Sequence, residues 1–327
     1  MASCDAKVAL GKDIVPGTLR WESPFAAWPR LVFAVLGAIS LAIWWGPLGS
    51  SFALALHDEQ YTHLLLILPI SANLIFVDWK SPDRSSASGV AIGSVLLVST
   101  LLIRWRAAVL PSDLQLSLSM LALVVCWNAS FVFCFGVPAF RRALFPLCFL
   151  LWLVPFPDFV LNPIVAMLQQ GSAASAHLLF AAVGISVAQR GMLLHIPGLT
   201  LEVAPECSSI RSSLMLIVTT MVVAQILLRS PWRKAAIVAT AVPLSIAKNG
   251  LRIFTLGVLA TRIDPSFLTG RLHRQGGVIF FVIALAAIFL LLWFLRHGEN
   301  KNDDSTRAEQ FEGKSENGSH PAGLSMG

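Results

Sequence analysis

The amino-acid sequence predicts an all-α integral membrane protein that crosses the bilayer many times. Of its 327 residues, 56% are hydrophobic and 13% are charged, whereas roughly 25% of residues are charged in an average soluble domain. The mean hydropathy is +0.72. The apolar residues come in long blocks rather than in the stripes of half-buried elements. Several blocks approach the ~20 residues that a helix needs to cross a bilayer.

Nine apolar segments follow one another along the chain. They cover residues 31–48, 62–79, 89–103, 114–137, 143–156, 163–187, 208–228, 235–260 and 277–295. Residues 1–30 carry charges and contain no apolar core, so we expect a cytoplasmic N-terminal segment and a retained first span. The composition turns polar after Arg296, which predicts a membrane domain over residues 31–296 and a disordered cytoplasmic tail over 297–327.

The charges between these segments predict the topology. With a cytoplasmic N-terminus, the basic residues gather in the cytoplasmic loops and tail: Lys80, Arg84, Arg141, Arg142, Arg229, Arg233, Lys234, Arg296 and Lys301. The first outer loop, residues 49–61, contains Asp58 and Glu59 but no lysine or arginine. This distribution follows the positive-inside rule. It requires one of the nine segments to begin and end on the same side of the membrane.

The segment at residues 163–187 is the candidate for that exception. Polar side chains interrupt its apolar run: Gln169, Gln170, Ser172, Ser175 and His177. Non-crossing amphipathic or re-entrant helices tolerate such groups where they lie on protein or line a wet cavity. The sequence therefore predicts eight transmembrane helices and one non-crossing helix.

A small hairpin is expected between this helix and the next span. Residues 192–203 form two short alternating arms around Pro197 and Gly198, a pair that suits the centre of a type II turn. The hairpin would lie on the outer face and would lead the chain to Glu206 and Cys207.

Cys207 differs from the other four cysteines. Cys126, Cys134 and Cys148 fall in apolar stretches and are interpreted as packing residues, and no CxxC pair or disulfide pattern is present. Cys207 stands in VAPECSSIRSS, where a polar turn meets a helix start, with Arg211 one turn later. Helix N-terminal amides and a nearby cation favour the thiolate. The alternative interpretation is a structural cysteine at the membrane boundary.

Two further residues are candidates for the same outer face. Arg252 lies inside the segment at 235–260 beside Lys248 and Asn249, and an intramembrane arginine indicates a functional site unless it extends to the headgroups. His273 lies in the last outer loop, where an exposed surface histidine is the alternative. Together with Cys207, these residues would supply a nucleophile, a cation and a base.

Four stretches of the chain resemble the exosortase/archaeosortase family, multi-pass cysteine transpeptidases of PEP-CTERM-type protein sorting. The stretches are YTHLLLILPISANLIF, LVPFPDFVLNPIVAMLQQ, VAPECSSIRS and NGLRIF with the later LHRQGG. The resemblance implies that Cys207 is the nucleophile, Arg252 the essential arginine and His273 the histidine. The chain departs from the family pattern at Pro205, where an acidic residue is common, and at Ser209, where glycine is frequent.

The resemblance implies an enzyme that cleaves the C-terminal sorting signal of exported proteins through a thioester, which then passes to an amine or to water. Its partners would be the sorting-signal helix and membrane lipid, in a bacterial inner membrane with the site facing outward; nucleic acid, metal and cofactor are not expected. Supporting or substrate-binding residues would be Glu206, Arg211, Lys248, Asn249 and His63.

Three alternatives accompany this interpretation. For His63, a hydrogen-bonded core histidine is the preferred interpretation over a residue that faces the same cavity. His195, Glu206, Cys207 and His273 could be drawn as a zinc site, but they lack metal-ligand spacing. The chain could also be a non-enzymatic transporter or an assembly component of polysaccharide export, although no internal repeat is visible.

Overall fold

The computed structural model describes residues 24–77, 87–203, 210–264, 266 and 277–317. The helices are α1 (Pro24–Ile43), α2 (Trp45–His57), α3 (Leu64–Val77), α4 (Ala87–Ala107), α5 (Ser112–Arg142), α6 (Leu144–Phe149), α7 (Asp158–Ala182), α8 (Ile210–Leu227), α9 (Pro231–Arg262) and α11 (Gly277–Asn317). Short 3₁₀ helices, η1 (Glu59–Tyr61) and η2 (Leu150–Leu153), and three short strands complete the described chain. The predicted all-α membrane class is confirmed, and each of the nine apolar segments forms a helix.

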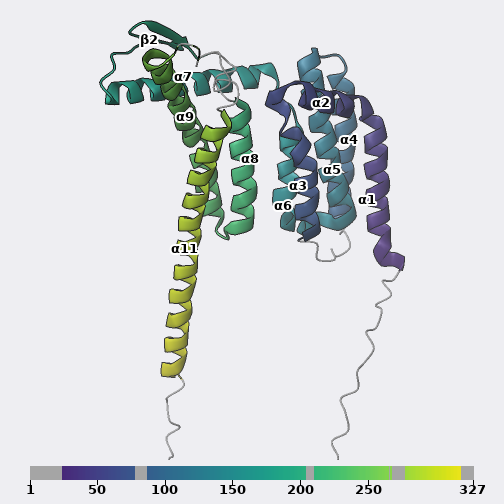
Figure 1. Cartoon of the computed structure of the whole chain (residues 1–327). Coiled ribbons are helices and arrows are strands. Elements are labelled where there is room, and N and C mark those ends of the chain that lie inside the picture. Colours follow the sequence, from purple (N-terminus) through teal and green to yellow (C-terminus); the bar gives the residue numbers. More distant parts are fainter. Residues whose placement is uncertain (1–23, 78–86, 204–209, 265, 267–276, 318–327) are drawn as a thin grey trace, which may run out of the picture.

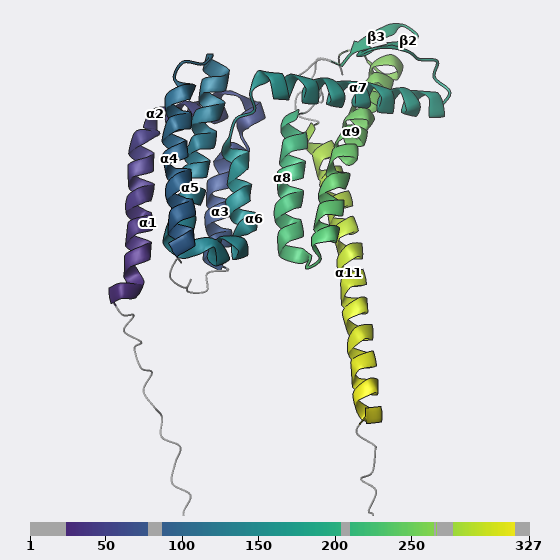
Figure 2. The same cartoon turned by 180° about the vertical axis from the view of Figure 1, so that it is seen from behind.

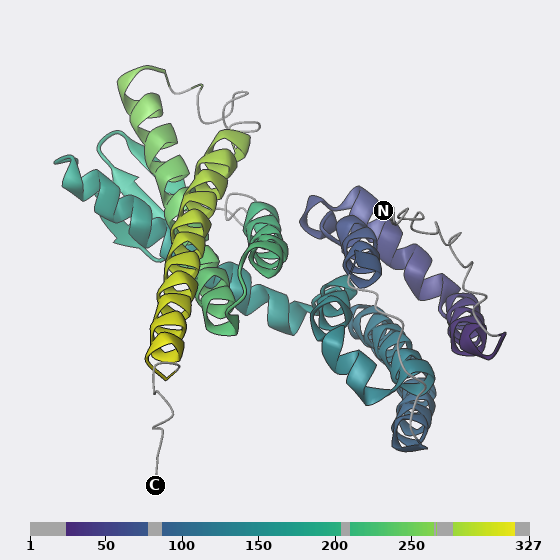
Figure 3. The ribbon, with the colours of Figure 1, turned by 90° about the horizontal axis from the view of Figure 1, so that it is seen from below.

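The helices form two groups that α7 connects (Figure 1 and Figure 3). In the first group, α1 to α6 share a core in which Leu123 of the long helix α5 is fully buried. In the second group, α8, α9 and α11 pack around Leu216, Ile237 and Ile288. Val218 of α8 belongs to the first core. Helix α8 therefore contacts both groups.

Helix α7 lies crosswise to the other long helices, over their upper ends (Figure 1 and Figure 2). Its buried residues include Gln169, Ser172, Ala173, Ala176 and Phe180, which recur every three or four positions and therefore share one face. This face rests on protein, so its polar members are accommodated without contacting lipid tails. The orientation agrees with the predicted non-crossing helix.

Length and composition alone do not settle how many helices cross the membrane. Among the described residues, six helices are long and apolar enough, α7 included, or up to seven if the bent pair α1–α2 forms one span. Two further apolar helices, Leu64–Phe76 and Leu144–Leu153, are shorter than these six. The count of eight spans stays a prediction.

Helix α2 was missed in the sequence, where residues 49–61 were assigned to an outer loop. The chain bends by 74° between α1 and α2. Leu48, Ser51 and Ala55 are buried at helical spacing along α2, which gives it one face for packing on the first group. The apolar run continues through the bend, so composition gave no sign of a second helix.

The predicted hairpin is confirmed. Strands β2 (Leu193–Ile196) and β3 (Leu199–Glu202) pair antiparallel, with Ile196 opposite Leu199, and Gly198 between them has a φ of 82°, the value required at the third residue of a type II turn. An additional strand, β1 (Ala188–Arg190), pairs with β2. The sheet packs against α7 and α9 through a core that contains Leu194, Phe180 and Ile253.

The tail differs from the expected disordered segment. Helix α11 continues without interruption from Gly277 to Asn317, well past the apolar segment that ends at residue 295. A polar sequence is a poor helix nucleus, but extending an existing helix avoids the cost of nucleation. The continuous helix α11 therefore corrects the prediction of disorder for residues 297–317.

The basic turns predicted to be cytoplasmic lie on one face of the bundle. Helix α5 ends at Arg142, and both this end and the turn between α8 and α9 lie at the bottom of Figure 1, opposite α7 and the hairpin; Figure 2 agrees. Arg104 and Arg106, in the last turn of α4, are at the other face. The described basic residues therefore lie mostly, but not all, on the face that is predicted to be cytoplasmic.

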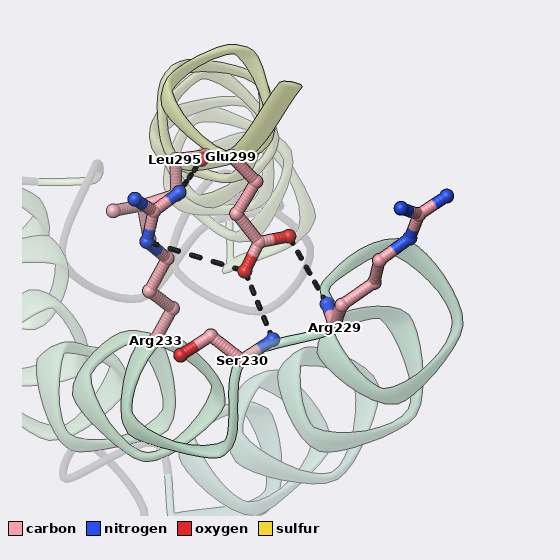
Figure 4. A network of polar contacts seen from close by, with 5 residues as sticks. All are labelled: Arg229, Ser230, Arg233, Leu295 and Glu299. Carbon is pink, nitrogen blue, oxygen red and sulfur yellow. Dashed lines mark hydrogen bonds and ion pairs between the residues drawn. The ribbon is translucent and has the colours of Figure 1, made fainter. Parts of the chain in front are cut away.

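A polar network joins α11 to the α8–α9 turn at this lower face (Figure 4). The Glu299 carboxylate accepts hydrogen bonds from the backbone N–H of Arg229 at 3.0 Å and of Ser230 at 2.9 Å. Arg233 lies 4.0 Å from the same carboxylate and donates to the Leu295 carbonyl at 2.7 Å. The network places a negative charge at the N-terminus of α9, where the helix dipole favours it.

Removing this carboxylate should loosen the second helix group. We expect Glu299→Ala to lower the stability of the protein in detergent by about 1 kcal/mol, the usual cost of losing an acceptor at a helix N-terminus. Thermal denaturation followed by circular dichroism would measure the change. Glu202→Ala, at an exposed position of β3, is the matched control. Equal midpoints for the two variants would show that the network adds no stability.

Candidate active site

Helix α9 carries polar side chains into the second helix group. Lys248 and Asn249 have only 6% and 1% of their surface exposed, and Arg252 is half-buried. Lys248 and Arg252 are four residues apart and therefore lie on the same face of the helix. Cations are costly within a membrane-spanning helix, so a pair of them indicates a functional site.

Lys248 connects α9 to the first turn of α8. Its ammonium donates a hydrogen bond to the hydroxyl of Ser212, and one turn earlier Ser245 donates to Ser213. Ser212 and Ser213 are five and six positions after Cys207 in the sequence. Lys248 therefore holds the helix that directly follows the candidate nucleophile.

Asn249 and Gly250 connect α9 to α7. The Asn249 side-chain amide donates to Ser172 Oγ at 3.0 Å. A Cβ atom at Gly250 would lie 2.4 Å from Ser175 Oγ and 3.0 Å from the backbone nitrogen of Ala176, so only glycine permits this approach of the two helices. The contact is two residues before Arg252, and it therefore fixes that turn of α9 against α7.

The Arg252 guanidinium lies beside the start of α11. A Cβ atom added to Gly277, the first residue of α11, would be 3.7 Å from Arg252 Nη1. Gly277 is four positions after His273 in the sequence. A guanidinium held at this junction of α9 and α11 can stabilise an anion such as a thiolate or an oxyanion.

Gln169 of α7 contributes a contact that the sequence did not predict. Its side-chain amide, 4% exposed, donates to the Val203 carbonyl at 2.9 Å. Val203 comes directly after β3 and four positions before Cys207. The polar residues of the segment at 163–187 had indicated a non-crossing helix. Gln169 and Ser172 are three positions apart and so lie on the same face of that helix, and this spacing was the signal that the face is polar and needs hydrogen-bond partners.

Three of the predicted site residues lie outside the described residues: Glu206, Cys207 and His273. Their predicted roles stay predictions. Arg211 is described and lies exposed in the first turn of α8. Among the described residues, Lys248 contacts Ser212, which follows Cys207 in the sequence, and Arg252 lies beside Gly277, which follows His273.

His63 belongs to the other helix group. It is 2% exposed, its Nδ1 donates to the Gln60 carbonyl at 3.1 Å, and its ring packs edge-on to Trp152 with centroids 6.4 Å apart. These contacts are those of a hydrogen-bonded core histidine, the alternative interpretation of this residue. Nearby, burial raises the pKa of Tyr61, and the carboxylates of Asp58 and Asp158 raise it further, so its hydroxyl stays protonated at neutral pH.

The burial of the three described cysteines agrees with the prediction at two positions and differs at the third. Cys126 and Cys134 are buried in the first core and fit the packing interpretation. Cys148 of α6 is exposed instead, which corrects its assignment as a buried packing residue. It lies on the side of α6 that does not pack on the first core. An apolar neighbourhood in sequence does not specify which side of a helix a residue occupies.

No group of three potential metal ligands gathers among the residues that the structure describes. His195, one member of the zinc site considered as an alternative, lies on β2 and has its Nδ1 3.0 Å from the Thr200 hydroxyl across the hairpin. This hydrogen bond gives the ring a structural role in the sheet.

Comparison with known proteins identifies the chain's relatives. The family model of the transmembrane exosortases matches residues 44–290. The matched region begins in the α1–α2 bend and ends within α11, so it contains both helix groups, α7 and the hairpin. No curated protein and no solved structure matches the chain.

Proposed function

The chain belongs to the transmembrane exosortase family, and from this premise we propose that it is a membrane cysteine transpeptidase or protease. Its substrates are exported proteins with a C-terminal sorting signal, which it cleaves through a thioester intermediate. The proposed catalytic residues are Cys207, Arg252 and His273. Glu206, Arg211, Lys248 and Asn249 support catalysis or bind substrate; the contacts of His63 favour a structural role.

The observation that carries the proposal is the convergence around Arg252. Its guanidinium lies against Gly277, four residues after His273, and the neighbouring Lys248 binds Ser212, five residues after Cys207. Described residues that follow Cys207 and His273 in the sequence thus contact the turn of α9 that carries Lys248 and Arg252. This supports the proposal, because a nucleophile, a cation and a base that act on one bond must lie close together.

In the proposed reaction, the Cys207 thiolate attacks the carbonyl carbon of the scissile peptide bond. The resulting oxyanion collapses, the C–N bond breaks, and His273 gives a proton to the departing amine. An acceptor amine or water then attacks the thioester carbonyl, loses its proton to His273 and releases the Cys207 thiolate. The Arg252 guanidinium has three available roles: it can stabilise the thiolate, the oxyanion or an acidic group of the substrate.

The proposed location is the inner membrane of a bacterium with the site facing outward. The hairpin and α7 lie at the end of the bundle opposite the basic α8–α9 turn (Figure 1). Because basic turns stay in the cytoplasm, this end would face the exterior. A sorting-signal helix could then enter the bilayer beside the enzyme and present its motif at the outer surface.

Co-expression with a substrate tests the proposal. The substrate should carry a short Pro-Glu-Pro-like motif, a transmembrane helix and a basic tail at its C-terminus. We expect a shortened product without the basic tail when wild-type enzyme is present, detected by immunoblot against tags at both substrate ends. A substrate that keeps its tail beside abundant, folded enzyme would contradict the sorting activity for that substrate class.

A further inference from the structure

We infer that Gln169 is a positioning residue of this reaction, because its amide fixes the chain that leads to Cys207 relative to the turn of α9 that carries Arg252. The inference rests on the proposed function, since it takes Cys207 as the nucleophile. Gln169 acts through Val203 and is not proposed to touch the substrate.

Both backbone polar groups of Val203 form hydrogen bonds. Its N–H donates to the Met192 carbonyl at 3.0 Å, and its carbonyl accepts from the Gln169 amide at 2.9 Å. Its side chain is also buried, at 1% exposed. The hairpin and α7 therefore determine jointly where the chain leaves β3.

The face of α7 that contacts Val203 also contacts α9. Gln169, Ser172 and Ser175 are spaced by three residues and share one side of the helix. The Gln169 amide donates to the Val203 carbonyl, Ser172 accepts a hydrogen bond from Asn249 of α9, and Ser175 lies close against Gly250 of α9. One continuous helix thus contacts both the approach to Cys207 and the turn before Arg252, so it sets the separation of these two chain segments.

Loss of the Gln169 amide would leave a buried acceptor, the Val203 carbonyl, without its donor. Leaving a buried acceptor unsatisfied is unfavourable. The chain can avoid that cost by shifting toward another donor or toward water. A displacement of about 1 Å in a reacting group can reduce catalysis on the order of 100-fold. A shift that relieves the unsatisfied carbonyl is therefore expected to reduce turnover.

Gln169→Met provides the test, because methionine keeps the length of the side chain and removes its donor. Gln170→Met is the matched control: Gln170 is the next residue of α7 and is exposed, with no hydrogen bond to any residue that the structure describes. Both changes are made in full-length protein whose Cys4, Cys126, Cys134 and Cys148 are replaced by alanine. The rate of Cys207 alkylation by N-ethylmaleimide is then measured in membranes as a function of pH.

We expect the alkylation midpoint of Gln169→Met to move to higher pH, because a displaced thiol loses the cation and helix amides that favour its thiolate. The kcat for substrate cleavage should fall by about 10- to 100-fold with KM changed by less than about 3-fold. Gln170→Met should match the parent in all three quantities. If Gln169→Met does not accumulate, Gln169→Leu, which also lacks a donor, replaces it.

An unchanged alkylation midpoint together with an unchanged kcat would overturn the inference. A rise in KM alone would also overturn it, since that would assign Gln169 to substrate binding. The alkylation profile needs no substrate, so the two proposals can fail separately. Cleavage by Cys207→Ser would refute the proposed function, whereas an inactive Cys207→Ser beside a normal Gln169→Met would refute only the role of Gln169.

Discussion

Cys207→Ser is expected to accumulate in the membrane at the wild-type level and to cleave no sorting-signal substrate. A serine hydroxyl is far harder to ionise than a thiol, and a nucleophile without an ionised form cannot open the thioester route. We expect cleavage to fall by on the order of 1,000-fold or more, as it does when a catalytic nucleophile is removed from an enzyme. The measurement is the amount of shortened substrate in membranes, normalised to the amount of enzyme.

The three cysteines that the structure describes provide the controls for this experiment. Cys126 and Cys134 are buried in the first core and Cys148 is exposed on α6, so alanine at any of the three removes a thiol from the first helix group, to which Arg252 does not belong. Each variant should retain cleavage, with at most about 1 kcal/mol lost in stability at the two buried positions. Wild-type cleavage by Cys207→Ser would exclude thiol catalysis and favour the non-enzymatic alternative.

Arg252→Lys is expected to lose cleavage almost as severely although the charge is kept. A guanidinium is planar and presents several N–H donors in a fixed arrangement, whereas an ammonium is a compact point charge on a flexible chain. Lys248 already supplies an ammonium one turn away, so a second ammonium would not replace the guanidinium beside Gly277. We expect a loss of about 100-fold or more, the size seen when one anion-stabilising donor is removed.

Arg262→Lys is the matched control, because Arg262 lies at the end of the same helix and is exposed. It should cleave substrate at the wild-type rate. Full activity in both variants would mean that only the positive charge at position 252 matters, and the two-pronged recognition of an anion would be abandoned. Activity lost in both would point to a general defect of α9.

Local composition predicted the helices well and their partners poorly. Each of the nine apolar segments forms a helix, because the length of an apolar run is a local property that decides whether a helix can enter a membrane. The bend that separates α2 from α1 and the exposure of Cys148 were not predicted. Both depend on which side of a helix meets another helix, and that information is absent from the composition of a segment.

The candidate site divides in the same way. Arg252, Lys248 and Asn249 were singled out because charged and amide groups are rare inside an apolar run. Their partners were not predicted, since Ser212 and Ser172 are 36 and 77 positions away in the sequence. Gln169 was noted only as an interruption of an apolar segment, and its contact with Val203, 34 positions away, became visible in the folded chain.

The sequence by itself determined the membrane class, the positions of the apolar helices, the type of turn in the hairpin and the family resemblance. Each of these depends on residues that are close along the chain. Only the tertiary structure decided that α7 lies across the ends of the other helices, that its polar face holds both Val203 and α9, and that Glu299 joins α11 to the α8–α9 turn. These features are hydrogen bonds and close approaches between segments that are distant in the sequence, and they depend on how the helices pack together, which local composition does not specify.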